Sequence, residues 1–222
     1  MSNATPKPNE VLLMGIAPPL QEAFPTHLVY SNADRIFTPP ECAAIISVGE
    51  SKGFSSGRIG NIKDGESSVD ESYRCVEVCN LTPTDVDATG QDIKWAFAKV
   101  AQRVSWANQK YGFHLSGFAE PWQLLKYTAP EDGRPAGHYK QHQDFGGGSS
   151  SIRKLSCVIQ LSHVTDYEGC RLHLQTNIDH EVPEVCQGDM IIFPSWTPHY
   201  VTPIQTGVRY AIAVWVGGPR FV

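Results

Sequence analysis

Apolar side chains recur at helical spacing in the first half of the chain and give way to short alternating runs in the second half. The first helical pattern follows Thr38, which we predict as its N-cap, with Glu41 completing a capping box three residues later and Gly53 ending the helix. The second covers residues 91–111, and Gly112 after it is a typical helix stop. The pattern therefore predicts two helices in this half.

Strand patterns follow. The stretch YRCVEVCN (residues 73–80) alternates apolar and polar positions and predicts one strand. From about residue 120 the chain consists of short β-type runs separated by turns, namely WQLLKYT, HYKQHQDF, KLSCVIQLS, CRLHLQT, DMIIFP, HYVTPI and RYAIAVWV. Many short strands at this spacing are typical of a sandwich or barrel. We therefore expect a mostly β (α+β) protein in which a helical N-terminal layer packs on an antiparallel β core.

Charge and composition narrow the class of protein. The 222 residues carry a net charge of −5 and a pI near 5.9, without a run of Lys or Arg, so we expect neither nucleic acid nor a membrane surface as partner. The apolar stretch near the start stops at Pro18 and Pro19, is too short to span a bilayer and does not have the form of a secretory signal. We therefore expect a cytoplasmic protein.

The domain organisation is read from the same patterns. Residues 1–26 are rich in Pro, Asn and small side chains, and we expect a flexible arm there. Residues 27–222 are expected to form a single domain, with helical support over about 27–118 and the β core over about 119–222. The six cysteines include no C-x-x-C pair, which favours reduced thiols over a disulfide framework. The oligomeric state stays open.

Two histidines and a carboxylate carry the first chemical signal. His142 and Asp144 stand two apart in HYKQHQDF, and in a strand such residues point to the same face. His199 opens another β-type run after a Pro-rich turn. Two histidines and one carboxylate on one face of an ion form the facial triad of non-haem Fe(II) oxygenases, which leaves the other positions open for co-substrate and O2. We therefore predict a metal site at these three residues.

An arginine follows the predicted metal site. Arg209 lies ten residues after His199 and opens the apolar run RYAIAVWV. An arginine in a β-rich interior is costly unless an anion pairs with it. A dicarboxylate co-substrate is such a partner, because the guanidinium group holds a carboxylate with two hydrogen bonds. This residue therefore predicts an anionic ligand.

The ordered set of motifs resembles one family. From about Trp122 onward the chain shows Y-x-x-H-x-D, RKLS, QLS, DYEG, GDMIIFPSWTPHYVTP and GVRYAIAVWV, with H-x(9)-R at the end. It is similar to the 2-oxoglutarate/Fe(II)-dependent oxygenases of prolyl-4-hydroxylase type, in their bacterial and phage branch. This resemblance implies a double-stranded β-helix (jelly-roll) core, Fe(II), 2-oxoglutarate and O2, with ascorbate as a candidate reductant.

The resemblance also implies residue roles and a reaction. His142, Asp144 and His199 would bind iron, and Arg209 would bind the C5 carboxylate of 2-oxoglutarate. Tyr127 matches the tyrosine whose hydroxyl helps to hold that carboxylate, and Ser156 and Trp215 match positions near the co-substrate. The implied reaction hydroxylates an unactivated C–H bond and releases succinate and CO2. A peptidyl prolyl residue and an amino-acid-like small molecule are both implied substrates.

Some features depart from the family pattern or favour other functions. GCRL (residues 169–172) and the longer loop TAPEDGRPAG leave the substrate open, whereas the carboxylate of Asp144 argues against a halogenase. DNA-repair dealkylases have the motif R-x-N-x-T-x-R in the last strand. This chain has RYAIAVW there, which argues against that branch. The alternatives are a non-catalytic metal-binding or ligand-binding jelly roll and a cupin-like enzyme that uses another metal. Arg209 argues against the cupin-like enzyme, because its reactions need no dicarboxylate.

Two loops and one further histidine remain. Residues 57–72 and 128–137 are polar and Gly-rich, and we expect both loops to cover the metal and to order when substrate binds. His138 lies four residues before His142. We expect a solvent-exposed or loop position for it, with a contact to the site or substrate as the alternative.

Overall fold

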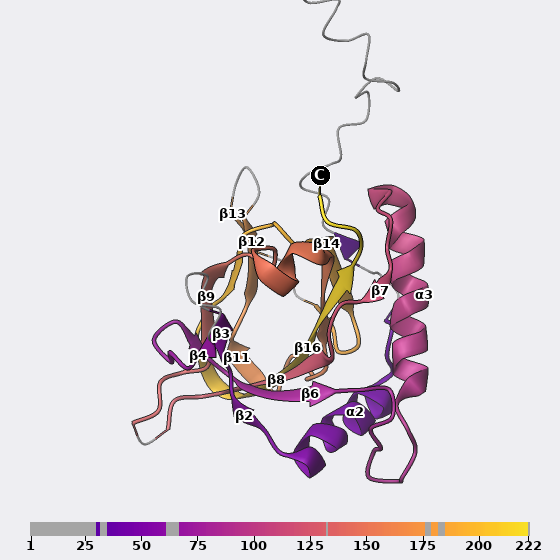
Figure 1. Cartoon of the computed structure of the whole chain (residues 1–222). Coiled ribbons are helices and arrows are strands. Elements are labelled where there is room, and N and C mark those ends of the chain that lie inside the picture. Colours follow the sequence, from indigo (N-terminus) through magenta and orange to yellow (C-terminus); the bar gives the residue numbers. More distant parts are fainter. Residues whose placement is uncertain are drawn as a thin grey trace, which may run out of the picture.

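A computed structural model describes residues 30–31, 35–60, 67–131, 133–175, 179–181 and 185–221. Within these ranges, two antiparallel sheets face each other and two helices lie beside the larger sheet (Figure 1). The predicted class, a mostly β protein with a helical N-terminal layer, is confirmed. The predicted arm of residues 1–26 lies outside the described residues.

The larger sheet has nine strands. Its main path runs through β1 (Tyr30–Ser31), β14 (Met190–Pro194), β10 (Arg153–Gln160), β16 (Ile204–Gly217), β8 (Trp122–Thr128), β6 (Glu77–Leu81) and β2 (Ser55–Ser56). Two further strands, β11 (Tyr167–Gly169) and β7 (Gly117–Phe118), pair with opposite ends of β16. The long strand β16 is therefore the centre of this sheet.

The smaller sheet has five strands, in the order β13 (Asp179–Glu181), β12 (Leu172–Gln175), β15 (His199–Val201), β9 (His138–His142) and β5 (Arg74–Cys75). A separate hairpin joins β3 (Ile59–Gly60) to β4 (Ser67–Ser68), and a 3-10 turn, η1, covers Gly148–Ile152. The smaller sheet thus carries both predicted histidine ligands.

Both predicted helices form. Helix α2 (Pro39–Lys52) begins with the predicted capping box, in which the backbone N–H of Thr38 donates to Glu41 Oε2 at 2.8 Å. Helix α3 (Lys94–Tyr111) ends at Gly112, whose φ of 69° is the left-handed conformation that glycine adopts most readily.

Alternation along β16 divides the interior into two regions. One set of side chains packs against the helices, where Phe97 of α3 stacks on Trp122 of β8 with ring centroids 3.6 Å apart. The other set faces the smaller sheet and includes Arg209, Ala211, Ala213 and Trp215. Because successive strand residues point to opposite faces, one apolar strand supports the helical core and also lines a cavity.

The prediction of one strand over residues 73–80 is wrong. The chain crosses between the sheets here, so that β5 pairs with β9 in the smaller sheet while β6 pairs with β8 in the larger. Val76, between the two strands, is buried. Alternation showed which positions are buried, but it carried no information on which sheet supplies the hydrogen bonds.

The two predicted loops differ in what surrounds them. Residues 57–72 include the β3–β4 hairpin, and their middle lies outside the described residues. Residues 128–137 precede β9, at the end of that strand opposite to His142. There Arg134 Nη1 lies 3.3 Å from Glu77 Oε2, and the Gly137 N–H donates to the Thr128 carbonyl at 2.9 Å. This position gives no support to a cover over the metal, and ordering on substrate binding stays a prediction.

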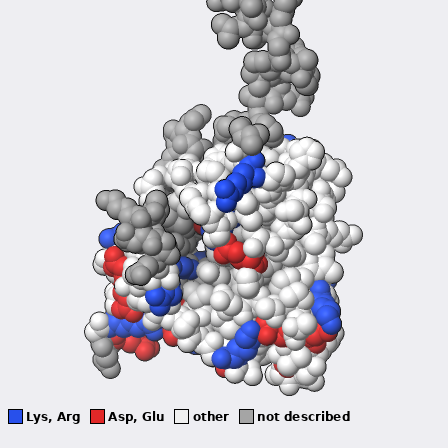
Figure 2. Space-filling model, viewed as in Figure 1, with Lys and Arg blue, Asp and Glu red and all other residues white. Residues whose placement is uncertain are grey.

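The surface shows no separation of charge on the face drawn in Figure 2. Basic and acidic side chains lie interspersed there rather than gathered by sign. Across the described ranges, no helix has the length and apolar character needed to cross a membrane.

Candidate metal and co-substrate site

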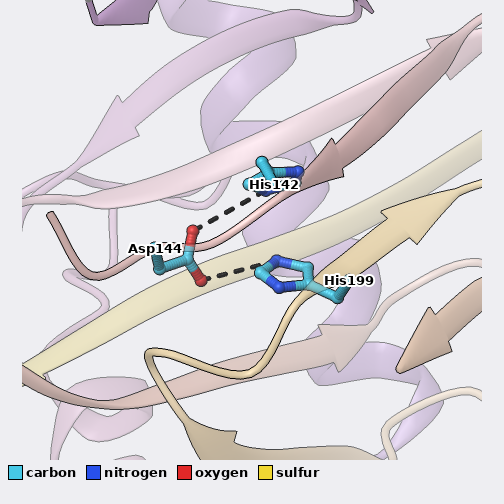
Figure 3. Close-up of side chains that lie close together, drawn as sticks. All are labelled: His142, Asp144 and His199. Carbon is cyan, nitrogen blue, oxygen red and sulfur yellow. Dashed lines mark ion pairs between the residues drawn. The ribbon is translucent and has the colours of Figure 1, made fainter. Parts of the chain in front are cut away.

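The structure brings the three predicted metal ligands together. His142 is the last residue of β9 and His199 the first of β15, and the two are direct partners in the antiparallel pairing. His142 Nε2 lies 3.7 Å from Asp144 Oδ1, and His199 Nε2 lies 3.5 Å from Asp144 Oδ2. The carboxylate therefore faces both imidazoles, with one oxygen directed toward each (Figure 3). All three ligand atoms lie within 4.8 Å of one another.

Asp144 reaches this position in a way that the strand pattern did not predict. β9 ends at His142, so Asp144 is not on a strand face. The chain turns instead, and the backbone N–H groups of Asp144 and Phe145 both donate to the Ser195 carbonyl, at 3.0 and 2.9 Å. The expected meeting of the two side chains is right, but a turn anchored beside β14 produces it.

The orientation of both imidazoles fits a metal. Nδ1 of His142 lies 2.8 Å from the Lys140 carbonyl, and Nδ1 of His199 lies 2.9 Å from the Thr197 carbonyl. Because a carbonyl oxygen only accepts, each Nδ1 carries the proton. Burial lowers the pKa of His142 to about 3, with His199 adding to the effect, so that His142 is neutral near pH 7. Its Nε2 therefore presents a lone pair toward Asp144.

The carboxylate completes the donor set. Burial by itself raises the pKa of Asp144, but His199, His142 and the hydrogen bond from Ser156 hold the pKa below its ordinary value. The Ser156 hydroxyl donates to Asp144 Oδ2 at 2.6 Å. Two imidazole nitrogens and one ionised carboxylate oxygen suit a divalent first-row metal with open positions. The residues present therefore fit the Fe(II) that the triad implies.

A narrow cavity runs from the triad to Arg209 along the inner face of the larger sheet. Its lining includes the small and apolar side chains of Leu125, Val158, Ala211 and Ala213. On β16, Trp215 lies beside Ser156 at the triad end and Arg209 beside Tyr127 at the other. The two alanines leave space where larger residues would close the cavity.

Arg209 is a buried cation without a buried anion. Its side chain is 3% exposed, and its Nε donates to Gln160 Oε1 at 3.0 Å. Its other hydrogen-bond contact is a weak one to Cys170 Sγ, at 3.9 Å from Nη1. In the described ranges no carboxylate pairs with it, whereas Arg153 pairs with Glu120 at 2.5 Å. A buried charge needs a partner, so this arrangement predicts an anionic ligand.

The residues implied for co-substrate binding separate into two groups. Tyr127 is buried beside Arg209, whose Cζ lies 5.6 Å from its ring, and burial raises the pKa of its hydroxyl so that it stays neutral. Ser156 and Trp215 lie instead at the triad end, where Ser156 contacts Asp144. Their roles in co-substrate binding stay predictions.

The sequence patterns did not single out every residue of the cavity. Arg74 of β5 lines it with its side chain almost buried, its Cζ lies 4.7 Å from the ring centroid of Tyr139, and its Nε has no partner in the described part. Tyr139, noted only as part of the Y-x-x-H-x-D motif, stacks on His142 with centroids 3.5 Å apart. A charged residue inside an alternating apolar run was the available signal for Arg74.

His138 does not join the triad. It lies on β9 and is half-buried, rather than exposed or in a loop as expected. Its Nδ1 lies 2.9 Å from the Ala136 carbonyl and its Nε2 3.3 Å from the Ser72 carbonyl. These contacts give His138 a position between β5 and the loop before β9.

Fold and site together define a jelly-roll protein with a cluster of two histidines and one carboxylate that could hold a metal ion. Residues 122–217 match the family model of the 2OG-Fe(II) oxygenase superfamily, and this segment contains the triad and Arg209.

The curated proteins to which the chain is similar include hydroxylases. The chain is 32% identical over 111 residues to a PKHD-type hydroxylase of Xylella fastidiosa (strain M23), which covers 49% of this chain and 40% of the relative. It is 35% identical over 100 residues to a PKHD-type hydroxylase of Stenotrophomonas maltophilia (strain R551-3), covering 41% and 44%. The chain thus spans less than half the length of these curated relatives.

Solved structures with the same fold include two prolyl hydroxylases. One is a Pseudomonas putida prolyl-4-hydroxylase, with a TM-score of 0.62, 18% identity, and coverage of 87% of this chain and 94% of that one. The other is a Trichoplax adhaerens prolyl hydroxylase in complex with a hypoxia inducible factor peptide fragment, with a TM-score of 0.66, 18% identity, and coverage of 85% and 83%. The expected jelly-roll core is therefore confirmed.

Proposed function

We propose that this chain is an Fe(II)- and 2-oxoglutarate-dependent dioxygenase that hydroxylates an unactivated C–H bond. The observation that carries the proposal is a single cavity with a metal donor set at one end and an uncompensated buried cation at the other. A ligand that fills it must bind a metal with one end and present a carboxylate at the other. The five-carbon 2-oxo dicarboxylate has this form.

The charges of the cavity favour a dianion. A bound Fe(II) ion, Arg209 and Arg74, less the carboxylate of Asp144, leave three positive charges, of which the dianion of 2-oxoglutarate would neutralise two and leave that of Arg74. Arg209 would hold the distal carboxylate with two parallel hydrogen bonds, and the ring of Tyr127 lies 5.6 Å from its Cζ. The apolar wall between the ends excludes water and strengthens both interactions.

His142, Asp144 and His199 would hold the iron, each oriented by its own hydrogen bond. When bound, the iron supplies the redox chemistry by which O2 oxidises 2-oxoglutarate to succinate and CO2 and the substrate C–H group to an alcohol. The protein orients the ligands and limits access of water. Ascorbate is a further proposed reductant.

For the substrate, we infer a peptidyl prolyl residue or an amino-acid-like molecule. This inference is supported by the family of residues 122–217 and by the hydroxylase names of the relatives. Arg74 also supports it, because a nearly buried positive charge in the cavity lining favours a substrate with a carbonyl or carboxylate group. A metal-only enzyme or a non-catalytic metal binder would leave Arg209 without a role.

The test is an anaerobic titration with Fe(II) and then 2-oxoglutarate, in which the visible charge-transfer band of the chelate is recorded. We expect the band in the wild type. In Arg209→Met, the 2-oxoglutarate concentration that gives half of the maximal band should rise roughly 100-fold, because the distal carboxylate loses its buried partner. The affinity for Fe(II) should stay unchanged.

The matched control is Arg220→Met, which removes an exposed arginine and should leave both affinities unchanged. A wild type that binds Fe(II) without producing the band would contradict the proposed function. Equal loss of Fe(II) and 2-oxoglutarate affinity in folded Arg209→Met would contradict the role of that residue.

A further inference from the structure

Within the described residues, the side chains in direct contact with Arg209 are neutral. They are Gln160 and Cys170, and the rings of Tyr127 and Tyr167 have their centroids 5.6 and 6.0 Å from its Cζ. Gln160 makes the shortest of these contacts and is 1% exposed, on the inner face at the end of β10. A fully buried glutamine is costly unless its polar atoms are all bonded, so its presence requires an explanation.

Every hydrogen-bonding group of the Gln160 amide has a partner. Its Nε2 donates to the Ser162 carbonyl at 2.9 Å and to the Tyr167 hydroxyl at 3.2 Å. Because the Ser162 carbonyl only accepts, the amide nitrogen must face it, and the amide oxygen must then face Arg209. Gln160 Oε1 accepts from Arg209 Nε at 3.0 Å. The network therefore fixes the orientation of Gln160, and Gln160 in turn holds the guanidinium group by its Nε.

The hydrogen bond to Gln160 leaves the two terminal nitrogens of Arg209 available for a carboxylate ligand. A guanidinium group held at Nε keeps the edge formed by its two terminal nitrogens for a bidentate partner. The bond is also to a neutral oxygen, so it orients the cation without neutralising it. A glutamate at the same position would make a buried ion pair with Arg209 and compete with any incoming carboxylate.

We propose that Gln160 is the positioning residue of the co-substrate site, which keeps Arg209 oriented and uncompensated and thereby selects 2-oxo acids that carry a distal carboxylate. The inference rests on the proposed function and adds the source of its co-substrate selectivity. Gln160 acts through Arg209 and takes no part in metal binding, because it lies at the opposite end of the cavity from Asp144.

The experiment compares two ligands on the anaerobic Fe(II)-loaded full chain by calorimetry. One is 2-oxoglutarate, and the other is 2-oxopentanoate, which has the same five-carbon chain with a methyl group in place of the distal carboxylate. Gln160→Glu should raise the Kd of 2-oxoglutarate about 100-fold, and Gln160→Met about 10-fold. Both variants should leave the Kd of 2-oxopentanoate within about twofold, because that ligand makes no ion pair with Arg209. Gln102→Glu, with the same charge change on an exposed residue of α3, should change neither.

The possible outcomes distinguish a failure of the proposed function from a failure of the role proposed for Gln160. If the wild type shows no preference for 2-oxoglutarate over 2-oxopentanoate, the proposed function is wrong and this inference with it. If the wild type has the preference and both Gln160 variants keep it, only the role of Gln160 is wrong. Equal loss of both ligands would show a merely structural residue and would also overturn the inference. Should Gln160→Glu fail to fold, Gln160→Met decides, because it fills the same space without charge.

Discussion

The two ends of the cavity are built in different ways. At the triad end, each histidine is oriented by a carbonyl only two residues away along the chain, that of Lys140 for His142 and that of Thr197 for His199. At the other end, Arg209 is held by Gln160, which lies 49 positions away in the sequence. Local contacts therefore orient the histidines, whereas distant strands orient the cation.

The two ends also treat charge in opposite ways. Asp144 is an anion surrounded by hydrogen-bond donors and imidazoles, and Ser156 stabilises its ionised form. Arg209 is a cation whose contacts, in the part of the chain that the structure describes, are with neutral groups. An end that stabilises its own anion is suited to a cation, and an end that leaves its cation uncompensated is suited to an anion. The following predictions test this contrast.

The largest effect is expected from His199→Ala. Removing one of three ligands should lower the affinity for Fe(II) by roughly 100-fold or more and abolish turnover, because the ion then has only two protein donors. Calorimetric titration with Fe(II) under anaerobic conditions measures it. His163→Ala, which removes an exposed histidine, is the matched control. Retained Fe(II) affinity in His199→Ala would show that the metal binds elsewhere.

An intermediate effect is expected from Ala211→Leu, which fills the cavity between its two ends. The Kd of 2-oxoglutarate should rise at least about 10-fold while the Fe(II) affinity stays unchanged, with a loss of about 1–3 kcal/mol in the free energy of unfolding from overpacking. Ala98→Leu, on the exposed face of α3, makes the same change outside the cavity. Unchanged 2-oxoglutarate binding would mean that the co-substrate does not occupy the cavity beside Ala211.

The smallest effect concerns the metal-free protein at mildly acidic pH. His142 has a pKa of about 3 in the folded chain, against about 6.5 when unfolded. Between these values the unfolded state binds more protons, so stability is lost as the pH falls. The loss due to this residue should approach about 1.4 kcal/mol per pH unit below 6.5.

Urea denaturation of metal-free protein between pH 7.5 and 5 measures this dependence, in a window above the titration of most carboxylates. His142→Phe, which keeps a ring of similar shape, should show a smaller slope than the wild type. Equal slopes in the two proteins would show that His142 is protonated equally in the folded and unfolded states.

Much of the site could be predicted from the sequence because its signals are local. The spacing of His142 and Asp144 put both side chains near one point, and a lone arginine in an apolar strand indicated a buried anion site at Arg209. The capping box of α2 and the glycine after α3 fixed the helix ends for the same reason. These features depend on residues within a few positions of one another.

Other features could not be predicted because they depend on which strands become neighbours. Alternation over residues 73–80 indicated burial correctly but gave one strand, where the chain divides between two sheets. Ser156 and Trp215 are direct partners across β10 and β16, which places both at the triad end. No sequence pattern contains that register.

The sequence by itself therefore determined the candidate metal ligands, the helix ends, the β character of the second half and the buried arginine. Each of these depends on residue type and short-range spacing. The tertiary structure alone decided that Arg209 faces the triad along a wall of alanines, that Arg74 lines the same cavity, and that Gln160 rather than a carboxylate holds the cation. The physical reason is that hydrogen bonds between strands and the polarity of a buried site arise from residues far apart in the chain, which meet only when the sheets form.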